Sequence, residues 1–268
     1  VTIGDNLGAD TFESIEGVIT GSGNDKLTGD SGSNFLNSGS GEDTIHGGDG
    51  DDTIYGGDDD DTIYGGDGKD IIRGEAGKDT VYGGSDNDTV YGGSDNDILH
   101  GDGGADILKG ESGSDTIYGG EGNDTASGGE GDDVISGGAG NDTMYGGETD
   151  STDSSSNDTV SYETVTSDLI VNLDEGSATG EGTDTLNGFE NIIGGSGDDK
   201  FILKAGETKN TINGTSGNDT VSYEKYTESV NVNLSNTIEQ LVSGNDSDKD
   251  TLLNIDNVTG GTKADILS

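Results

Sequence analysis

The chain has 268 residues, and only 26% of them are hydrophobic, far below the roughly 45–50% of a typical globular protein. Its 56 acidic and 11 basic residues give a formal charge of −45, so apolar burial alone cannot offset the entropy lost on folding. This charge excludes nucleic acid and anionic membranes as default partners, because both require clustered Lys and Arg. The chain is therefore either an acidic disordered segment or a protein that folds when a cationic partner neutralises it.

Residues 1–19 contain the end of an irregular repeat unit. Asp10 precedes Asp25 by fifteen residues, and a six-residue insert at 14–19 lies between two nonapeptides. The same arrangement recurs twice later in the chain, with inserts at 188–193 and 254–259. We expect each insert to extend one strand by an apolar pair. Because the chain opens inside such a unit, we interpret it as a segment of a longer repetitive protein.

Residues 20–145 divide without insertion or deletion into fourteen nonapeptides, such as Gly-Gly-Asp-Gly-Asp-Asp-Thr-Ile-Tyr at 47–55. Position one is Gly in twelve units, and position four is Gly in eleven, with Asp59, Asp86 and Asp95 in the other three. Both positions are expected to adopt φ > 0, which Gly tolerates without strain. Each unit is therefore predicted to contain a tight turn.

The second half of each nonapeptide predicts a short strand. Position six is Asp in thirteen units and Asn34 in the remaining one. Position eight is apolar in every unit, from Leu27 to Met144, and it lies between two more variable residues. Because side chains alternate along a strand, this pattern indicates a three-residue strand with one buried face.

These residues resemble the RTX calcium-binding nonapeptide family, whose pattern GGxGxDxUx, with U a large apolar residue, is matched throughout 20–145. The resemblance implies an all-β fold, a parallel β-roll or β-solenoid in which two nonapeptides make one coil of 18 residues. Odd and even units would form two sheets, with turns along both edges. It also implies a segment of a larger secreted RTX protein.

Calcium is the predicted cation. Ca²⁺ accepts six to eight oxygen ligands, carbonyls included, whereas Mg²⁺ requires near-octahedral geometry and gives up water reluctantly. A strand spacing of about 4.8 Å would let the turns of units n and n+2 share one ion, as with Asp43 and Asp61. Fourteen units give twelve such pairs, so we expect about ten or more ions, with the pair that includes Asn34 the weakest.

The predicted ligands are the position-six residues of the central run and of the flanking units. They are Asp25, Asn34, Asp43, Asp52, Asp61, Asp70, Asp79, Asp88, Asp97, Asp106, Asp115, Asp124, Asp133, Asp142, Asp158, Asp184, Asp199, Asp219, Asp250 and Asp265.

The rest of the chain is predicted to hold a loop at 146–157 and two degenerate units with hairpin inserts, at 158–213 and 214–268. Each degenerate unit begins near the segment Asp-Thr-Val-Ser-Tyr-Glu, at 158–163 and 219–224, followed by an alternating stretch that indicates a hairpin. Asp246 and Asp248 fit the start of an EF-hand loop, but Thr251 occupies the position that requires Gly, so this reading is not favoured.

Several function classes are excluded or disfavoured. The absence of Cys and the presence of only two His exclude disulfides and sites rich in thiolate or His. No apolar run approaches a membrane span, and no signal peptide opens the chain at Val1. No convergent set of unlike groups indicates catalysis, so the chain is not predicted to be an enzyme. His46 and His100 share position nine with Tyr64, Tyr82 and Tyr118, where an aromatic ladder stabilises stacked strands.

The favoured function is calcium binding that drives the folding of a structural or spacer segment, as in an adhesin, a surface-layer protein or a toxin-like protein. The alternatives are a surface that binds carbohydrate or ice through the outward Thr and Tyr rows, and an accessory module of a secreted enzyme. By resemblance, the expected partner is a type I secretion apparatus, and the expected location is secreted or at the cell surface. Exposed end strands predict contact with neighbouring modules or self-association.

Overall fold

A computed structural model of the chain describes residues 11–13, 16–147, 156–206, 209–234, 240–241 and 249–268. The chain forms two compact units, Val1–Ser156 and Asn157–Ser268, and each is considered by itself. All regular secondary structure in the described residues is β-strand, and none of them belongs to a helix that could cross a membrane.

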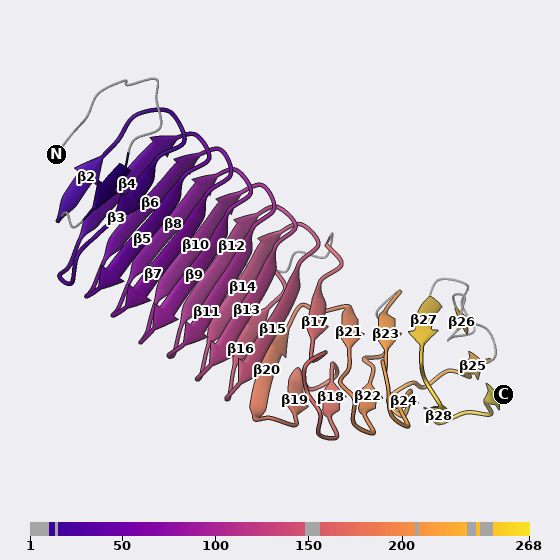
Figure 1. Cartoon of the computed structure of the whole chain (residues 1–268). Coiled ribbons are helices and arrows are strands. Elements are labelled where there is room, and N and C mark those ends of the chain that lie inside the picture. The colour runs from indigo at the N-terminus through magenta and orange to yellow at the C-terminus, as the bar shows by residue number, and fades with distance from the viewer. Residues whose placement is uncertain (1–10, 14–15, 148–155, 207–208, 235–239, 242–248) are drawn as a thin grey trace. The chain divides into compact units, whose positions relative to one another are not determined.

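The first unit is a parallel β-roll with two sheets (Figure 1). One sheet contains, in spatial order, β1 (Thr11–Glu13), β3 (Lys26–Thr28), β5 (Thr44–Asp49), β7 (Thr62–Asp67), β9 (Thr80–Ser85), β11 (Ile98–Gly103), β13 (Thr116–Glu121) and β15 (Val134–Ala139). The other contains β2 (Gly17–Ile19), β4 (Phe35–Ser40), β6 (Thr53–Asp58), β8 (Ile71–Ala76), β10 (Thr89–Ser94), β12 (Ile107–Ser112), β14 (Thr125–Glu130) and β16 (Thr143–Tyr145).

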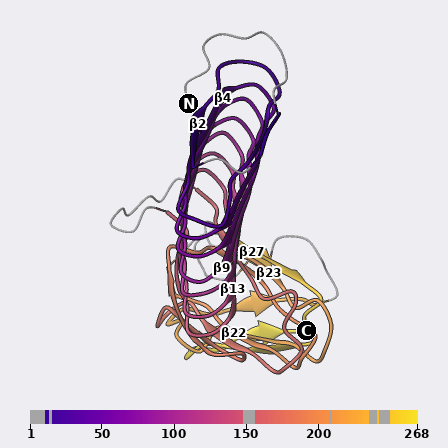
Figure 2. The same cartoon turned by 60° about the vertical axis from the view of Figure 1, so that its left-hand side comes forward.

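The predicted coil of two nonapeptides is confirmed. Within the central run, each strand pairs in parallel with the strand 18 residues further on, as the partners Ile45 and Ile63 illustrate. Figure 2 shows these coils stacked one on another. Most strands have six residues instead of the predicted three, because positions two and three of the following nonapeptide also pair with the next coil, for example Gly48 with Gly66.

The core of the first unit is a single row of side chains between the two sheets. Position-eight residues from Leu27 to Met144 are no more than 1% exposed. Burial of a side chain of this size stabilises a fold by roughly 1.5–3 kcal/mol. Because each half-coil contributes only one such side chain, the core is thin. Unfavourable interactions in the turns could therefore outweigh the stabilisation that the core provides.

The glycine positions partly differ from the prediction. Position four has positive φ as expected in every unit except that of Gly32, also where it is Asp59 (φ 78°), but the second such position is position two, as at Gly48 (φ 119°). Position one does not lie in this region within residues 20–145. It is Gly because space is lacking: a Cβ on Gly47 would stand 2.2 Å from Oδ2 of Asp52 and 2.5 Å from the carbonyl oxygen of Gly65.

The six-residue inserts do not extend neighbouring strands, so that prediction was wrong. The last three residues of each insert form a separate strand: β2, β21 (Asn191–Ile193) and β28 (Asn257–Thr259). Val18 of the first insert and Phe189 and Ile192 of the second insert are buried. Each insert therefore makes a shortened half-coil that retains the strand and loses the glycine-rich part of the turn.

The second unit also has two sheets. One contains β17 (Thr159–Ser161), β21, β23 (Thr211–Asn213), β27 (Lys249–Leu253) and β26 (Gln240–Leu241). The other contains β20 (Thr183–Asn187), β19 (Ser177–Thr179), β18 (Ile170–Asn172), β22 (Lys200–Ile202), β24 (Thr220–Ser222) and β28. A short third pair joins β25 (Asn231–Val232) and β29 (Ile266–Leu267).

The hairpin predicted in the first degenerate unit is confirmed, because β18 pairs antiparallel with β19, which pairs antiparallel with β20. In the second degenerate unit, β26 pairs antiparallel with β27. Asp10, Asp246, Asp248 and most of the predicted loop at 146–157 lie outside the described residues.

Candidate calcium-binding turns

The position-six side chains of the central run line both edges of the roll and are buried. From Asp25 to Asp142 their exposed fractions lie between 0 and 4%, Asn34 included. Each follows the tight turn of its own nonapeptide and precedes a strand, so the backbone turn brings its carboxylate inward. A carboxylate buried in this way is costly unless hydrogen bonds or a counter-charge compensate it.

One oxygen of each carboxylate is compensated by the backbone. Oδ1 of Asp61 accepts a hydrogen bond from the N–H of Asp43, one coil earlier, at 2.8 Å. The same bond recurs at each 18-residue step from Asp25 to Asp142, at 2.6–2.9 Å. The structure therefore brings together the n and n+2 residues that the sequence predicts to share an ion.

The other oxygen, Oδ2, is buried without a hydrogen-bond partner in most of the run. The residues concerned are Asp43, Asp52, Asp61, Asp70, Asp79, Asp88, Asp97, Asp106, Asp115 and Asp124.

In ten turns of the central run, Oδ2 and a backbone carbonyl oxygen converge on the same space beside the first glycine. Oδ2 of Asp61 and the carbonyl oxygen of Gly74 lie 2.5 and 2.8 Å from the point where a Cβ of Gly56 would stand. The same convergence recurs at Gly65, with Asp70 and the Gly83 carbonyl. Two acceptors that face each other without a donor repel, and a cation between them would convert this repulsion into attraction.

The pKa values of these carboxyls show the electrostatic cost of the arrangement. Burial, opposed by the backbone hydrogen bond and reinforced by neighbouring carboxylates, raises the pKa of Asp61, Asp88 and Asp97 to about 8. Burial likewise raises the pKa of Asp70 to about 7 and that of Asp79 to about 6. At neutral pH the buried row cannot be fully ionised unless positive charge is added.

The donor set fits a hard cation. Carboxylate and carbonyl oxygens converge in ten turns of the central run, and these are the ligands that Ca²⁺ prefers. Among the described residues no three His, Cys, Asp or Glu side chains gather as they would in a compact metal cluster. That finding agrees with a site in which each turn adds one carboxylate and the backbone supplies further oxygens.

The predicted ligands of the second unit fall into different environments. Asp219 matches the central pattern, because its Oδ1 accepts the Asp199 N–H at 2.9 Å and its Oδ2 is buried without a partner. Both oxygens of Asp199 are hydrogen-bonded, to the N–H groups of Leu169 and Gly195. Asp158 is also buried, while Asp265 is half-buried and accepts the Val230 N–H.

Asp184 and Asp250 differ from all of these, since their Oδ2 atoms accept hydrogen bonds from tyrosine hydroxyls.

Further position-six residues were missed in the sequence. Asn210 lies two residues before the buried Ile212, is itself 1% exposed, and donates its N–H to Oδ1 of Asp250. Glu190 and Asp256 hold the equivalent place in two inserts and accept the N–H groups of Asp158 and Asp219. The signal was available: each stands two residues before the apolar residue of its strand.

Comparison with known families identifies the repeat. The model for the RTX calcium-binding nonapeptide repeat matches overlapping segments that run from residue 18 to residue 152, just over half of the chain. The chain belongs to this family. Residues 153–262 match a second family model, the C terminal part of the serralysins of peptidase family M10. No curated protein matches the chain.

Among solved structures, the chain is similar to a hyperactive, Ca²⁺-dependent, β-helical antifreeze protein from an Antarctic bacterium. The sequence identity is 25%, the match covers 84% of this chain and 67% of that one, and the TM-score is 0.33.

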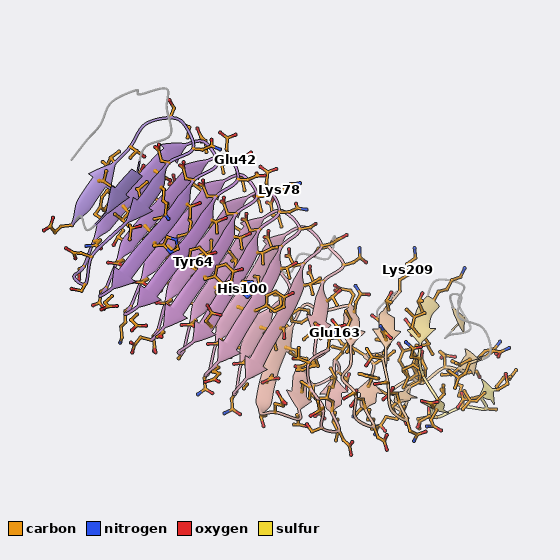
Figure 3. The ribbon with its side chains drawn as sticks, viewed as in Figure 1. Glu42, Tyr64, Lys78, His100, Glu163 and Lys209 are labelled. Carbon is orange, nitrogen blue, oxygen red and sulfur yellow. The ribbon has the colours of Figure 1, made fainter. Side chains whose placement is uncertain are left out.

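The RTX assignment confirms the predicted family and fold class, and it makes the chain a calcium-binding β-roll. The outer face of the roll carries a row of stacked aromatic rings. His46, Tyr64, Tyr82, His100 and Tyr118 stack across β5 to β13 with centroid distances of 4.6–5.0 Å and interplanar angles of 4–13°. Figure 3 shows Tyr64 and His100 in this row. Because the rings cover one another's faces, stacking of a sugar on an inner ring of the row is blocked.

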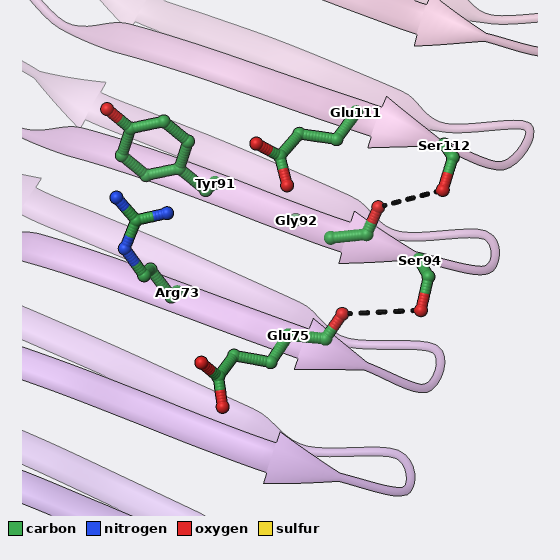
Figure 4. Close-up of a pocket in the computed structure, with 8 residues that line it drawn as sticks. Arg73, Glu75, Tyr91, Gly92, Ser94, Glu111 and Ser112 are labelled. Atoms are coloured by element: carbon green, nitrogen blue, oxygen red, sulfur yellow. Dashed lines mark hydrogen bonds between the residues drawn. The ribbon is translucent and has the colours of Figure 1, made fainter.

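The opposite face of the RTX roll carries a shallow groove over β8, β10 and β12 (Figure 4). The Arg73 guanidinium lies 3.9 Å from the centroid of the Tyr91 ring, and Lys109 Nζ lies 5.7 Å from it. Glu75 and Glu111 flank the groove further along the strands. These contacts join neighbouring coils through cation–π attraction.

Proposed function

We propose that Ca²⁺ ions occupy the turns between coils along both edges of the central roll, and that their binding drives the folding of this segment outside the cell. The observation that carries the proposal is the buried Oδ2 row, in which one carboxylate oxygen per turn faces a backbone carbonyl with no donor between them. The position-six Asp residues of 20–145 would supply the carboxylates, and the glycine-rich turns would supply the carbonyls.

Charge supports the same proposal. The twelve n and n+2 pairs joined by hydrogen bonds could each hold one ion, adding up to +24 to a formal charge of −45. Without ions, folding would bury acceptors that repel one another, and the thin core would provide little stabilisation to offset that repulsion. With ions, the same atoms become ligands, so binding and folding are one process.

The extracellular role follows from mass action. A ligand that binds only the folded state stabilises it by RT ln(1 + [L]/Kd) per site, so many weak sites have little effect where free Ca²⁺ is scarce and dominate where it is abundant. The chain would thus leave the cell unfolded through a type I secretion apparatus and fold in the medium. Since it contains no Cys, it needs no disulfide chemistry there.

For the folded segment we propose a structural or spacer role, because coils that contact only their neighbours propagate as a stiff unit. A second candidate is an accessory module of a secreted enzyme. The match of 153–262 to the C terminal part of serralysins favours it. Under both proposals the chain carries no reaction of its own.

The deciding experiment is a Ca²⁺ titration of the full chain, followed by far-UV circular dichroism and by calorimetry, with Mg²⁺ as the matched control. We expect coil to convert cooperatively to strand with Ca²⁺ and not with Mg²⁺ at the same concentration. A chain with full strand content in excess EGTA, or with equal responses to both ions, would overturn the proposal.

A further inference from the structure

The second unit contains two position-six carboxylates that are compensated in a way not seen in the central run. The hydroxyl of Tyr162 donates a hydrogen bond to Oδ2 of Asp184 at 3.0 Å, and the hydroxyl of Tyr223 donates one to Oδ2 of Asp250 at 3.1 Å. The two tyrosines are 5% and 0% exposed, and the two aspartates are 6% and 0% exposed. Both bonds are therefore buried and shielded from water.

The oxygen that receives the hydroxyl corresponds to the one left without a partner in the central roll. Asp250 follows the central geometry at its other oxygen, since Oδ1 accepts the Asn210 N–H at 2.9 Å, as Oδ1 of Asp61 accepts that of Asp43 at 2.8 Å. The Oδ2 of Asp250, unlike that of Asp61, accepts a hydrogen bond from a hydroxyl. A buried acceptor needs a donor or a cation, and here a neutral hydroxyl is the donor.

The arrangement occurs twice in the second unit. Tyr162 and Tyr223 occupy the same place in the repeated segment Asp-Thr-Val-Ser-Tyr-Glu. The bonded aspartates lie 22 and 27 residues further along the chain. Because the intervening segments differ in length and sequence, the recurrence of the bond indicates that the Tyr and Asp pair is the retained feature.

We propose that these two tyrosine hydroxyls take the place of calcium at Asp184 and Asp250, so that neither aspartate binds an ion, although the nonapeptide pattern predicts both as ligands. The second unit then contains two kinds of turn. In one kind a tyrosine hydroxyl donates to the carboxylate, and in the other, at Asp219, the Oδ2 atom has no hydrogen-bond partner. The unit then needs fewer ions per turn than the central roll. The inference rests on the proposed function, because Asp184 and Asp250 are compared with the central turns that are proposed to bind Ca²⁺.

The test counts bound ions in the full chain by equilibrium dialysis with ⁴⁵Ca²⁺. Asp184→Asn with Asp250→Asn should leave the number of ions unchanged, whereas Asp61→Asn with Asp79→Asn should lower it. Loss of ions in the first variant would overturn the inference and leave the proposed function intact. A wild-type chain that binds no Ca²⁺ would overturn the proposed function instead.

A second pair of variants separates this role from ordinary packing. Tyr162→Phe with Tyr223→Phe removes the donors and leaves the carboxylates, so hydrogen exchange of β18, β22 and β24 should become more dependent on Ca²⁺ than in the wild type. The matched control is Tyr226→Phe, because the buried Tyr226 hydroxyl donates to the carbonyl of Lys204 and not to a carboxylate. It should weaken protection equally at all Ca²⁺ concentrations. The same Ca²⁺ dependence in both variants would contradict the inference.

Discussion

Asp61 contacts Asp43 across one coil: its Oδ1 accepts the Asp43 N–H at 2.8 Å while its Oδ2 stays buried without a partner. The hydrogen bond orients the carboxylate and uses only one of its two oxygens. The other oxygen and the Gly74 carbonyl oxygen lie 2.5 and 2.8 Å from the point where a Cβ of Gly56 would stand. The coil contact that builds the solenoid thus also builds half of the expected ion site.

Removal of calcium should unfold the central unit. In excess EGTA we expect the far-UV circular dichroism of the full chain to lose strand signal, because the repelling acceptors of the central unit outweigh a core of one side chain per half-coil. Hydrogen exchange with peptide resolution locates the change. Retention of slow exchange in β5 to β13 under EGTA would contradict the coupling of binding to folding.

Substitution at position six should weaken calcium binding more than substitution at position five. Asp61→Ala with Asp79→Ala removes two buried carboxylates, and calorimetry should show at least a tenfold loss of affinity, about 1.4 kcal/mol, together with reduced cooperativity. The control is Asp60→Ala with Asp198→Ala. These exposed carboxylates also accept backbone N–H groups one coil on, from Lys78 and Asn218. Equal losses would mean that the buried oxygen is not a ligand.

Asn34→Asp should create a stronger site between units two and four. The Asn34 amide makes both of its hydrogen bonds within its own turn. Its Oδ1 accepts the Asp30 N–H at 2.8 Å, and its Nδ2 donates to the Asp30 carboxylate at 3.3 Å. A carboxylate cannot donate and would add a full negative charge beside Asp52. We expect one additional ion, or roughly tenfold tighter binding at this site, in calorimetry.

The control for this change is Ser33→Asp, which adds the same charge at an exposed neighbouring position. If both variants bind Ca²⁺ alike, the effect is one of net charge and not of a ligand.

How much could be predicted from the sequence depends on how regular the register is. The nine-residue period predicts the short strands and the buried position eight, because these depend only on which residues repeat. The two sheets and the coil of 18 residues were expected from the resemblance to the RTX family. The reason for Gly at position one was not predictable, since a Cβ on Gly47 would meet Asp52 and a carbonyl from the next coil. That clash exists only once the coils are stacked.

Prediction failed further where the period breaks. The bond between Tyr162 and Asp184 spans a hairpin of irregular length, so no spacing rule connects the two residues. Treating every position-six residue as equivalent also hid the difference between Asp219 and Asp250. Calcium ligation by the position-six residues themselves stays a prediction, for which the structure supplies the placement and the experiments above supply the test.

Tyr82→Ala should destabilise the calcium-loaded roll. Its ring stacks on Tyr64 at 5.0 Å and on His100 at 4.6 Å, and each aromatic pair contributes about 0.5–1.5 kcal/mol beyond burial. Loss of both pairs should therefore cost about 1–3 kcal/mol in chemical denaturation. Tyr145→Ala is the control, because Tyr145 has no ring contact among the described residues. Equal losses for the two variants would show that the ladder adds nothing beyond the area of each ring.

The pH dependence should reverse sign with calcium. Burial raises the folded-state pKa of Asp61, Asp88 and Asp97 to about 8, from the ordinary 3.8, so the ion-free fold holds protons that the unfolded chain releases. Their contribution to stability is fully present below about pH 3.8 and is lost as the pH rises through about 8. In EGTA, circular dichroism should therefore show more strand at pH 5 than at pH 8.5.

In saturating Ca²⁺ the carboxylates are ionised ligands, and protons compete with the ion, so stability should fall as the pH drops toward 3.8. The variant with Asp61, Asp88 and Asp97 all changed to Asn provides the control, because its amides are neutral at every pH. In EGTA it should show a smaller gain of strand on acidification than the wild type. If acidification of the chelated wild type produces no strand, or if the variant gains as much as the wild type, the buried carboxylates are not the groups that oppose folding.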